Sequence, residues 1–272
     1  MLGTCSRPAG KAVLLEQAES CNPRVAVLIP IYKPTLLPLE EFSVTHSLSL
    51  IKERECVFVA PDGLDVSYYQ KHYPRSRFEL FAPENFTSVE SYSRLLLSPD
   101  FYNRFLDYEF ILILQPDAIL FRDDLDFWMD QGYDYIGAPW PEGIEITLWR
   151  DDFQGDRRQR IKTHVGNGGL SLRRVRSCIE LMNEFPETYA AFARSGTNED
   201  SYFSLLGTQS PNFRVPEEID ASSFAMELAP ERYFALNGGQ FPMGAHAWSQ
   251  VNPIFWTDCL LHQPVKARRK TR

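Results

Sequence analysis

The sequence lacks the patterns that mark several common protein classes. The five cysteines are scattered along the chain, at Cys5, Cys21, Cys56, Cys178 and Cys259. An odd set without a Cys-x-x-Cys pair indicates neither a disulfide framework nor a zinc knuckle. The apolar runs are too short to cross a bilayer, and the N-terminal residues lack the continuous apolar segment of a secretory signal. We therefore expect no transmembrane span and a cytoplasmic location.

The chain also lacks an excess of positive charge, since its net charge is -8 at pH 7. A phosphate backbone is bound by a basic surface, so this balance argues against nucleic-acid binding. The exception is a basic tail, residues 263–272, which carries lysines and arginines from Lys266 to Arg272. We interpret the tail as a solubilising end, with weak peripheral association with an anionic membrane as the alternative.

Several catalytic and nucleotide-binding motifs are missing as well. The chain contains no Gly-x-Gly-x-x-Gly and no Walker lysine, which disfavours dinucleotide-binding and P-loop folds. It also contains no His-Glu-x-x-His and no Gly-x-Ser-x-Gly, so neither a zinc protease nor a serine esterase is indicated. Any chemistry must come from a less standard set of residues.

The residues that are present predict one α/β domain. At 44% hydrophobic residues, 272 residues can build a large single core. We expect a flexible lead-in at 1–23, a single domain at 24–262 and the tail at 263–272. Apolar, β-branched runs at 25–31, 56–60 and 110–114 are typical of buried parallel strands, and 39–51 has helical spacing. Residues 133–138 and 169–173 are shorter strand-like segments, and a further helix extends to residue 185.

Two helix starts are marked by capping residues. Thr87 and Glu90 match a capping box, which predicts a helix that begins there. Asn198 precedes Glu199 and Asp200 at the start of another apolar segment, in the position of an N-cap. Acidic residues at a helix start stabilise the helix dipole, but a carboxylate held there can also act as a general base.

Asp117 is the first candidate for binding a ligand. It follows the apolar strand 110–114 after Gln115 and Pro116, and the carboxyl ends of strands in open α/β sheets carry ligands. A carboxylate in this place suits a hard cation such as Mg²⁺ or Mn²⁺, although a turn aspartate that caps the next segment is equally consistent. The acidic residues that follow, Asp123, Asp124 and Asp126, are typical of a solvated turn and helix start.

A glycine-rich segment and a histidine are the remaining candidates. Gly166-Asn-Gly-Gly169 lets the backbone approach a ligand closely, and a tight hairpin is the alternative interpretation. His246 lies among small residues near Trp248, where an imidazole is able to bind a metal or serve a structural role.

The order of these features resembles that of glycosyltransferases with the GT-A fold. Those enzymes have a DxD region, a glycine loop, an xED motif and a C-terminal histidine, which correspond here to Asp117, Gly166–Gly169, Glu199 with Asp200, and His246. The flanking sequences look like those of a little-characterised microbial family of domains of unknown function, regarded as glycosyltransferases. The resemblance covers about residues 25–248. It implies a Rossmann-like mixed sheet, mostly parallel and flanked by helices.

The resemblance also implies roles for individual residues. Val27 to Lys33 and Asp62 would line a pocket for the nucleotide of a nucleotide-sugar donor. The residues implied to bind this donor are Pro30, Tyr32, Asp62, Gln115 and Asp117. Asp117 and His246 would hold Mn²⁺ or Mg²⁺, which stabilises the negative charge that develops on the leaving diphosphate.

The remaining implied roles concern transfer to the acceptor. Asp200, with Glu199 beside it, would be the base that activates a hydroxyl of a carbohydrate or glycoconjugate, which predicts inversion at the anomeric carbon. The implied acceptor-binding residues are Gly168, Gly169, Trp140 and Trp248.

One departure from the pattern leaves alternatives open. Gln115 occupies the first acidic position of the DxD pattern and cannot ionise, so the sequence predicts weak metal affinity. A non-catalytic sugar- or nucleotide-binding protein of the same fold is one alternative. A sugar nucleotidyltransferase is another, but its usual glycine- and lysine-rich loop is replaced here by Pro30-Ile-Tyr-Lys-Pro34.

Overall fold

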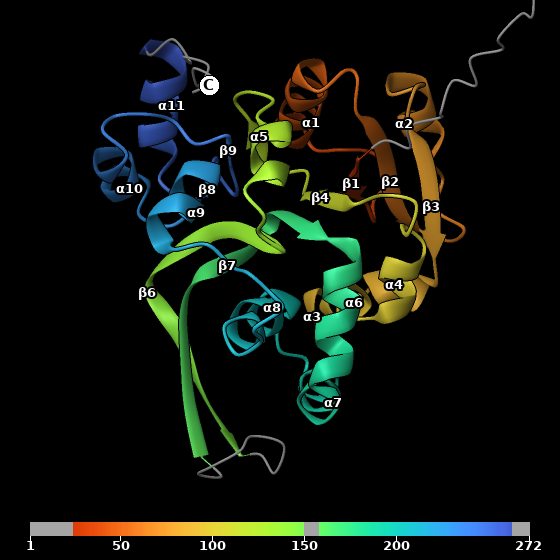
Figure 1. The fold of residues 1–272 in the computed structure, drawn as a ribbon. Helices are drawn as coiled ribbons and strands as arrows, with labels where there is room; N and C mark the ends of the chain where they lie inside the picture. Colours follow the sequence, from red (N-terminus) through yellow and green to blue (C-terminus); the bar gives the residue numbers. More distant parts are fainter. Residues whose placement is uncertain (1–23, 150–157, 263–272) are drawn as a thin grey trace, which may run out of the picture.

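The computed structural model describes residues 24–149 and 158–262, so the predicted lead-in and basic tail lie outside the described residues. The chain has a mixed α/β fold around a six-stranded sheet of order β3-β2-β1-β4-β7-β6 (Figure 1). Its strands are β1 (Val25–Pro30), β2 (Glu55–Pro61), β3 (Arg77–Phe81), β4 (Phe110–Leu114), β6 (Tyr135–Trp149) and β7 (Arg158–Arg174).

Four neighbouring strands of this sheet are parallel. β1 pairs in parallel with β2 and β4, and β2 pairs in parallel with β3. β7 then runs antiparallel to both β4 and β6. Every residue of β1 and β4 is buried, as expected for strands covered on both faces. The predicted strands at 25–31, 56–60 and 110–114 are confirmed, and the sheet is mostly parallel, as the GT-A resemblance implied.

Helices cover both faces of the sheet (Figure 1). Alternate residues of β1 contribute to two cores: Val25, Val27 and Ile29 face the first, whereas Ala26 and Leu28 face the second. The first core is covered by α1 (Pro38–Leu50), α2 (Ser67–His72) and α5 (Leu125–Asp130). The second is covered by α3 (Val89–Leu96), α4 (Pro99–Asn103), α6 (Val175–Glu184), α7 (Pro186–Ser195) and α8 (Glu199–Gly207).

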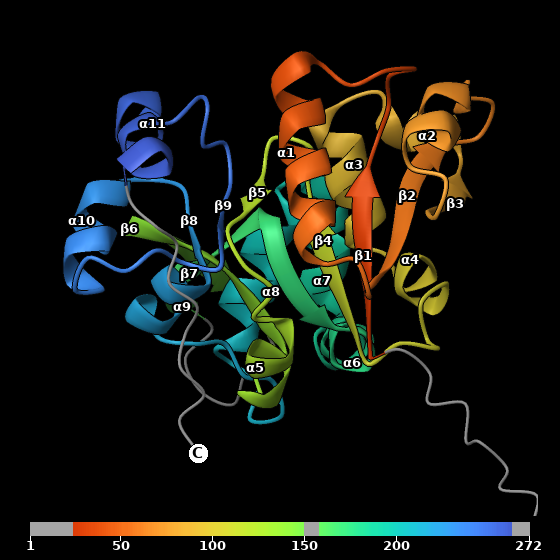
Figure 2. The same cartoon turned by 90° about the horizontal axis from the view of Figure 1, so that it is seen from above.

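The C-terminal part of the chain builds a second, three-stranded sheet. Its order is β5-β9-β8, from β5 (Ile119–Leu120), β9 (Gly244–Ala245) and β8 (Ala225–Met226). Nearby helices are α9 (Glu218–Phe224), α10 (Pro230–Leu236) and α11 (Pro253–His262). α10 and α11 lie on the opposite side of the molecule from β2 and β3 in both views (Figures 1 and 2). Because β5 closely follows β4, this small sheet brings residues near 245 to the end of β4.

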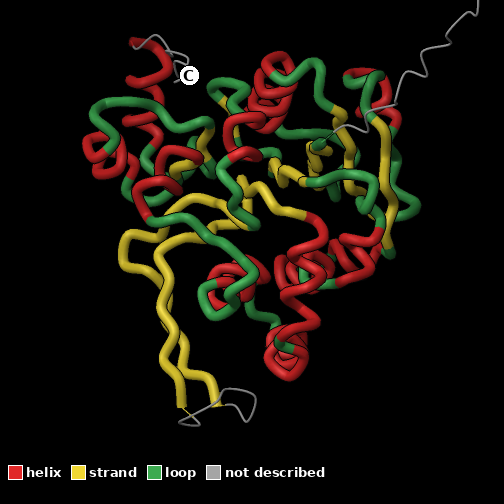
Figure 3. The backbone as a smooth tube through the Cα atoms, in the orientation of Figure 1, coloured by secondary structure: helices red, strands yellow, loops and turns green. Residues whose placement is uncertain are grey.

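A long hairpin of β6 and β7 was not predicted. The sequence indicated only short strands at 133–138 and 169–173, but the two strands continue together as an arm that extends from the body (Figure 3). On this arm, Ile146 pairs with Ile161, and Glu145 pairs with Lys162. Ile161 is buried and Ile146 is packed against the second core. Apolar and charged residues therefore alternate along this arm, as expected for strands that have one face packed on the core and one face in solvent.

The predicted start of α3 is wrong by one residue. Ser88, and not Thr87, is the N-cap: its Oγ accepts from the Ser91 N–H at 3.0 Å, and the Ser91 Oγ accepts from the Ser88 N–H at 3.0 Å. The Thr87 hydroxyl instead donates to a carbonyl of the 3₁₀-helix η1 (Pro83–Phe86). Ser88 has the extended backbone that a cap requires, whereas Thr87 already has helical angles. Among the described helices, none is long and apolar enough to cross a membrane.

Candidate active site

The carboxyl ends of three neighbouring parallel strands meet at one edge of the sheet. Pro30 ends β1, while Asp62 and Gln115 directly follow β2 and β4. Tyr32, two residues beyond β1, has 59% of its surface exposed. These four residues were predicted to bind the donor, and the parallel pairing of the strands brings them to the same edge.

Part of the predicted nucleotide pocket belongs to the core instead. Val27, Leu28 and Ile29 are fully buried within the sheet, so they cannot line a pocket. Beside Asp62 the surface does contain a cavity of about 880 Å³. Its other lining residues come from the end of β3, the turn of η1, and helices α3 and α4: Leu80, Phe81, Ala82, Pro83, Asn85, Arg94, Leu95, Ser98, Asp100, Phe101 and Arg104.

His246 lies against the residues that follow β4. It comes directly after β9, and its backbone N–H donates to the Met226 carbonyl at 3.0 Å. Its Nε2 atom is 3.3 Å from Oδ1 of Asp117 and 3.1 Å from Oε1 of Gln115. The small sheet therefore joins two segments that are about half the chain apart, and the predicted proximity of Asp117 and His246 is observed.

Two carboxylates enclose this imidazole. Its Nδ1 atom is 3.3 Å from Oε1 of Glu227, opposite the nitrogen that faces Asp117. Burial alone would lower the pKa of His246, but Asp117 and Glu227 outweigh burial and raise this pKa to about 9. Burial would raise the pKa of Asp117, but the neighbouring His246 holds it below its ordinary value. At neutral pH the imidazole of His246 is therefore protonated and faces an ionised Asp117.

The donor atoms around His246 suit a divalent cation. A carboxylate oxygen, an imidazole nitrogen and an amide oxygen are accepted ligands of Mn²⁺. In the structure these separations of 3.1 and 3.3 Å are a hydrogen bond and an ion pair of the imidazole, so a cation would bind here with release of the imidazole proton. Within the described residues, no three His, Cys, Asp or Glu side chains form a metal-binding group. Asp117 and His246 are thus a candidate two-residue set, and the Gln115 amide is their neutral neighbour.

The glycine-rich segment lies inside β7 and is not a hairpin. Its partner strand changes register here, because Gly137 pairs with Ser171 while the next residue, Ala138, pairs with Asn167. The intervening residues form a bulge, which lets neighbouring side-chain positions face different ways. The alternative interpretation as a tight hairpin is therefore wrong.

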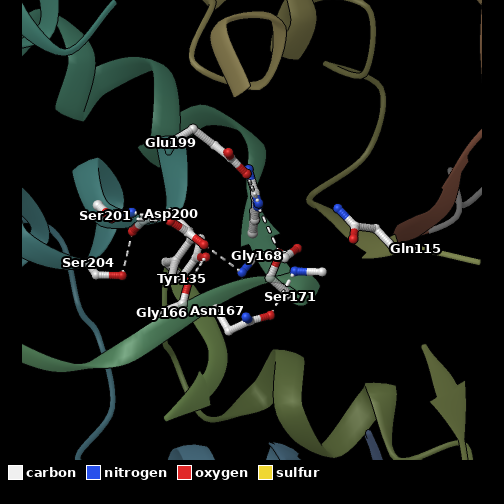
Figure 4. Close-up of polar contacts among 12 residues, drawn as sticks. Gln115, Tyr135, Gly166, Asn167, Gly168, Ser171, Glu199, Asp200, Ser201 and Ser204 are labelled. Carbon is white, nitrogen blue, oxygen red and sulfur yellow. Dashed lines mark hydrogen bonds and ion pairs between the residues drawn. The ribbon is translucent and has the colours of Figure 1, made fainter. Parts of the chain in front are cut away.

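The two glycines of the bulge contact different parts of the site. A Cβ atom on Gly169 would lie 2.2 Å from Nε2 of His246. A Cβ on Gly168 would lie 3.0 Å from Oε1 of Glu199, and the Gly168 N–H donates to Oδ2 of Asp200 at 3.1 Å. Consecutive residues thus connect the histidine to the acidic pair, and Gly168 lies between Asp200 and Gln115 in Figure 4.

Glu199 and Asp200 form the first turn of α8, and both are buried. Asn198 is at the N-cap position but makes no side-chain cap bond. Asp200 accepts from its neighbour instead, through the Ser201 N–H at 2.6 Å. Burial, and then the negative charge of Glu199, raise the pKa of Asp200 to about 7, against the effect of Arg173 and two backbone N–H groups. A carboxyl with this pKa exchanges a proton near neutral pH.

The two predicted acceptor-binding tryptophans differ in their surroundings. Trp140 is half-buried, and its ring would be 2.7 Å from a Cβ on Gly166, at the start of the glycine segment. Trp248 is 8% exposed, packs against Phe42 and donates from Nε1 to Oγ of Ser43 at 2.9 Å. These contacts favour a structural role for Trp248 over stacking on an acceptor sugar.

The acidic residues that follow Asp117 lie at the start of α5 and form ion pairs with arginines. Arg54 binds Asp123 at 3.1 Å and Asp126 at 2.9 Å, and Arg122 pairs with Asp124 at the N-cap of α5. The interpretation of this cluster as a turn and helix start agrees with the structure. None of these contacts involves the site around His246.

Sequence reasoning gave no role to two residues that contact the site. Arg173 is fully buried and its Nη2 donates to Oε1 of Glu199 at 2.8 Å, while Glu227 faces His246. A signal for Arg173 existed, because a charged residue within an otherwise apolar strand needs a buried partner. Glu227 carried no such signal, since it follows a strand of only two residues.

One protein family accounts for most of the described chain. The model of a family described as "Protein of unknown function (DUF5672)" matches residues 75–246. The chain belongs to the DUF5672 family. The DUF5672 match contains Asp117, the glycine segment, Glu199 and Asp200, and it ends at His246.

Two solved structures are similar to this DUF5672 protein at low identity. One is mouse xyloside xylosyltransferase 1 in its apo form, with 11% identity, a TM-score of 0.49, and coverage of 82% of this chain and 97% of that one. The other is a glycosyltransferase involved in glycosylation of the major capsid of PBCV-1, with 11% identity, a TM-score of 0.36, and coverage of 82% and 92%. Comparison with curated proteins gave no match. Likenesses of this size transfer no activity to the DUF5672 chain.

Proposed function

We propose that the chain is a glycosyltransferase that moves a sugar from a nucleotide-diphosphate donor to a hydroxyl of a carbohydrate or glycoconjugate. One observation carries the proposal. Consecutive glycines, Gly168 and Gly169, link a buried carboxyl whose pKa is raised to about 7 to an Asp117–His246 pair suited to a divalent cation. A general base near neutral pH beside a cation-binding pair is what transfer from a diphosphate requires.

In this proposal Asp200 accepts the proton of the acceptor hydroxyl. The acceptor oxygen forms a bond to the anomeric carbon, while the bond from that carbon to the diphosphate oxygen breaks and the electron pair leaves with the diphosphate. Attack from the face opposite the leaving group inverts the anomeric centre. The expected pKa of about 7 keeps a large fraction of Asp200 ionised under neutral conditions.

The donor would bind at the carboxyl ends of β1, β2 and β4. Asp62 lines a cavity of about 880 Å³, whereas the other residues implied to bind the donor, Pro30, Tyr32, Gln115 and Asp117, do not line it. Asp117 and His246 would hold Mn²⁺ or Mg²⁺, with Gln115 as a neutral ligand. When bound, the cation would neutralise the charge that develops on the leaving diphosphate. Because Gln115 cannot ionise, we expect weaker metal affinity than two carboxylates would give.

Trp140 is the better candidate for contact with the acceptor. Its half-buried ring lies over Gly166, and the carbonyl of Gly166 accepts from the Tyr135 hydroxyl at 2.5 Å. An aromatic ring in this place would stack on one face of a sugar close to Asp200. Gly168 and Gly169 would allow the acceptor to approach the backbone.

The first experiment is a thermal-shift screen against UDP-, GDP-, ADP- and CMP-sugars, with and without Mn²⁺. A nucleotide that raises the melting temperature identifies the donor. Transfer by Asp200→Asn is then compared with transfer by the wild type. We expect the variant to lose transfer and keep measurable donor binding. Turnover at the wild-type rate by this variant would remove Asp200 from the mechanism.

Gln115 favours a second candidate, a non-catalytic sugar- or nucleotide-binding protein. A site with one neutral side chain in place of a carboxylate can hold a nucleotide without promoting its departure. The same screen separates the two. Donor binding without transfer or donor hydrolysis, at every pH and with every divalent cation, would favour the binding protein.

A further inference from the structure

Arg173 is the least exposed charged residue near the acidic pair, with no accessible surface. It lies on β7, five residues beyond Gly168, and its guanidinium donates in three directions. Nε donates to Oγ of Ser171 at 3.0 Å, Nη1 to the Tyr102 hydroxyl at 3.2 Å, and Nη2 to Oε1 of Glu199 at 2.8 Å. A buried cation is tolerated only with such partners, so its position is strongly determined.

These bonds close a ring around the candidate base. The Ser171 hydroxyl, which accepts from Arg173, donates to the Gly168 carbonyl at 2.9 Å. The Gly168 N–H donates in turn to Asp200, and Asp200 is joined to Glu199 by the chain. Glu199 accepts from Arg173 and completes the ring. One side chain therefore holds both the glycine segment and the start of α8.

Aromatic rings fix the plane of the guanidinium. Its central carbon lies 5.3 Å from the centre of the Tyr135 ring and 5.7 Å from that of Phe203. A planar, forked donor meets these rings and three acceptors together, which a lysine ammonium cannot do. The geometry is thus specific to arginine.

We propose that Arg173 is a positioning residue that holds Glu199 in a direct ion pair and thereby leaves Asp200 as the carboxyl that takes the acceptor's proton. This inference rests on the proposed transfer reaction. Two adjacent buried carboxyls repel as anions, so one of them must hold a proton unless a cation balances the pair. The direct ion pair joins the cation to Glu199, while Asp200 accepts from neutral donors, which are the Gly168 and Ser201 N–H groups and the Ser201 hydroxyl.

The other ionisable groups near the pair stay neutral around pH 7. Burial raises the pKa of the Cys178 thiol to about 12 and moves the pKa of each nearby phenol further above its ordinary value. These groups come from α6, α3, α4 and β6: Cys178, Tyr92, Tyr102 and Tyr135. The guanidinium of Arg173 is then the charge that opposes the two carboxylates.

The test is a carbon-detected NMR titration of the Asp200 carboxyl in the protein without substrate, with its resonance identified by Asp200→Asn. In Arg173→Met we expect the midpoint to rise by about one to three pH units, because the positive charge that lowers the pKa of Asp200 is then lost. In Arg173→Met with Glu199→Gln the midpoint should return toward the wild-type value. Glu199→Gln alone should lower it.

The matched control is Arg174→Met. Arg174 is the next residue of β7 but binds Glu109 and Asp134 instead, so this variant should leave the Asp200 midpoint unchanged. A midpoint that does not move in Arg173→Met, or that moves equally in the double variant, would overturn the proposal. If Arg173→Met does not fold, the direction of the shift in Glu199→Gln decides, and a rise or no change overturns it.

Transfer kinetics provide a separate readout. The pH of half-maximal kcat should follow the NMR midpoint across the variants, while KM for the donor changes little. A purely structural role for Arg173 would lower kcat at every pH without moving the profile. If the midpoints shift as expected but no variant or wild-type protein transfers a sugar, the charge arrangement stands and the proposed function fails.

Discussion

The raised pKa of Asp200 predicts that the contribution of this carboxyl to folding stability is lost as the pH rises toward neutrality. A carboxyl whose pKa moves from 3.8 to about 7 on folding is proton-bound in the native state at pH values where the unfolded chain has released its proton. This carboxyl therefore favours folding below pH 4, and its contribution is lost between about pH 4 and pH 7. The resulting change in the free energy of unfolding is at most roughly 4 kcal/mol. Above pH 8 the contribution of this group is constant.

Asp200→Asn removes the titrating group and keeps its shape. The amide can offer only one acceptor to the N–H groups of Gly168 and Ser201, which costs about 1 kcal/mol at every pH. We expect the stability of the variant, relative to wild type, to increase from pH 4.5 to pH 8 and then to level off. Urea denaturation at constant ionic strength measures this difference. Carboxyls with lowered pKa, such as Asp117, titrate below this window in both proteins.

Asp100→Asn is the matched control for loss of one charge at a helix start. Asp100 is exposed in the first turn of α4. The reasoning would be refuted if the difference between Asp200→Asn and wild type were no steeper with pH than that of the control, or if it changed in the opposite direction. Either result would mean that Asp200 is an ordinary ionised carboxylate in the native protein.

Three further predictions concern the histidine side of the site. Gly169→Ala places a Cβ 2.2 Å from Nε2 of His246 and should destabilise the fold by about 1–3 kcal/mol in urea, a cost that His246→Ala should largely relieve. Glu227→Gln should weaken Mn²⁺ binding about 10- to 100-fold by calorimetry, since Glu227 orients the imidazole; unchanged affinity would exclude that role. Asp123→Asn should leave Mn²⁺ affinity within about twofold, because Asp123 pairs with Arg54 and accepts from the Leu125 N–H, away from His246.

The sequence predicted the central sheet well because burial on both faces leaves a strong pattern. In β1, β2 and β4 nearly every residue is apolar, and polar residues begin where the strand ends. Asp62 and Gln115 could therefore be assigned to the carboxyl edge before the topology was known. Asp200 and His246 were selected by the order of motifs, and their roles stay predictions.

Other features depended on tertiary contacts that have little local signal. The cap of α3 is shared by two serines, and a Ser–Ser capping pair is weaker as a pattern than Thr87 with Glu90. The long β6–β7 hairpin contains the alternation Ile144-Glu-Ile-Thr147, too short to distinguish from a loop. The ring through Arg173 joins β7 to α8, and no window of sequence contains both partners.

The direction of β7 explains why glycines are found so far from both acidic motifs in sequence and so close to them in space. Because β7 is antiparallel to β4, the β7 residues just before Leu170 lie at the edge where β4 ends, and the Gln115 N–H donates to the Gly169 carbonyl at 2.9 Å. A side chain on either bulge residue would meet His246 or Glu199. Two glycines in succession are thus required by contacts on opposite sides. If β7 ran parallel to β4, the opposite end of β7 would lie beside the end of β4. The glycine bulge would then be far from His246 and could not link the imidazole to Asp200.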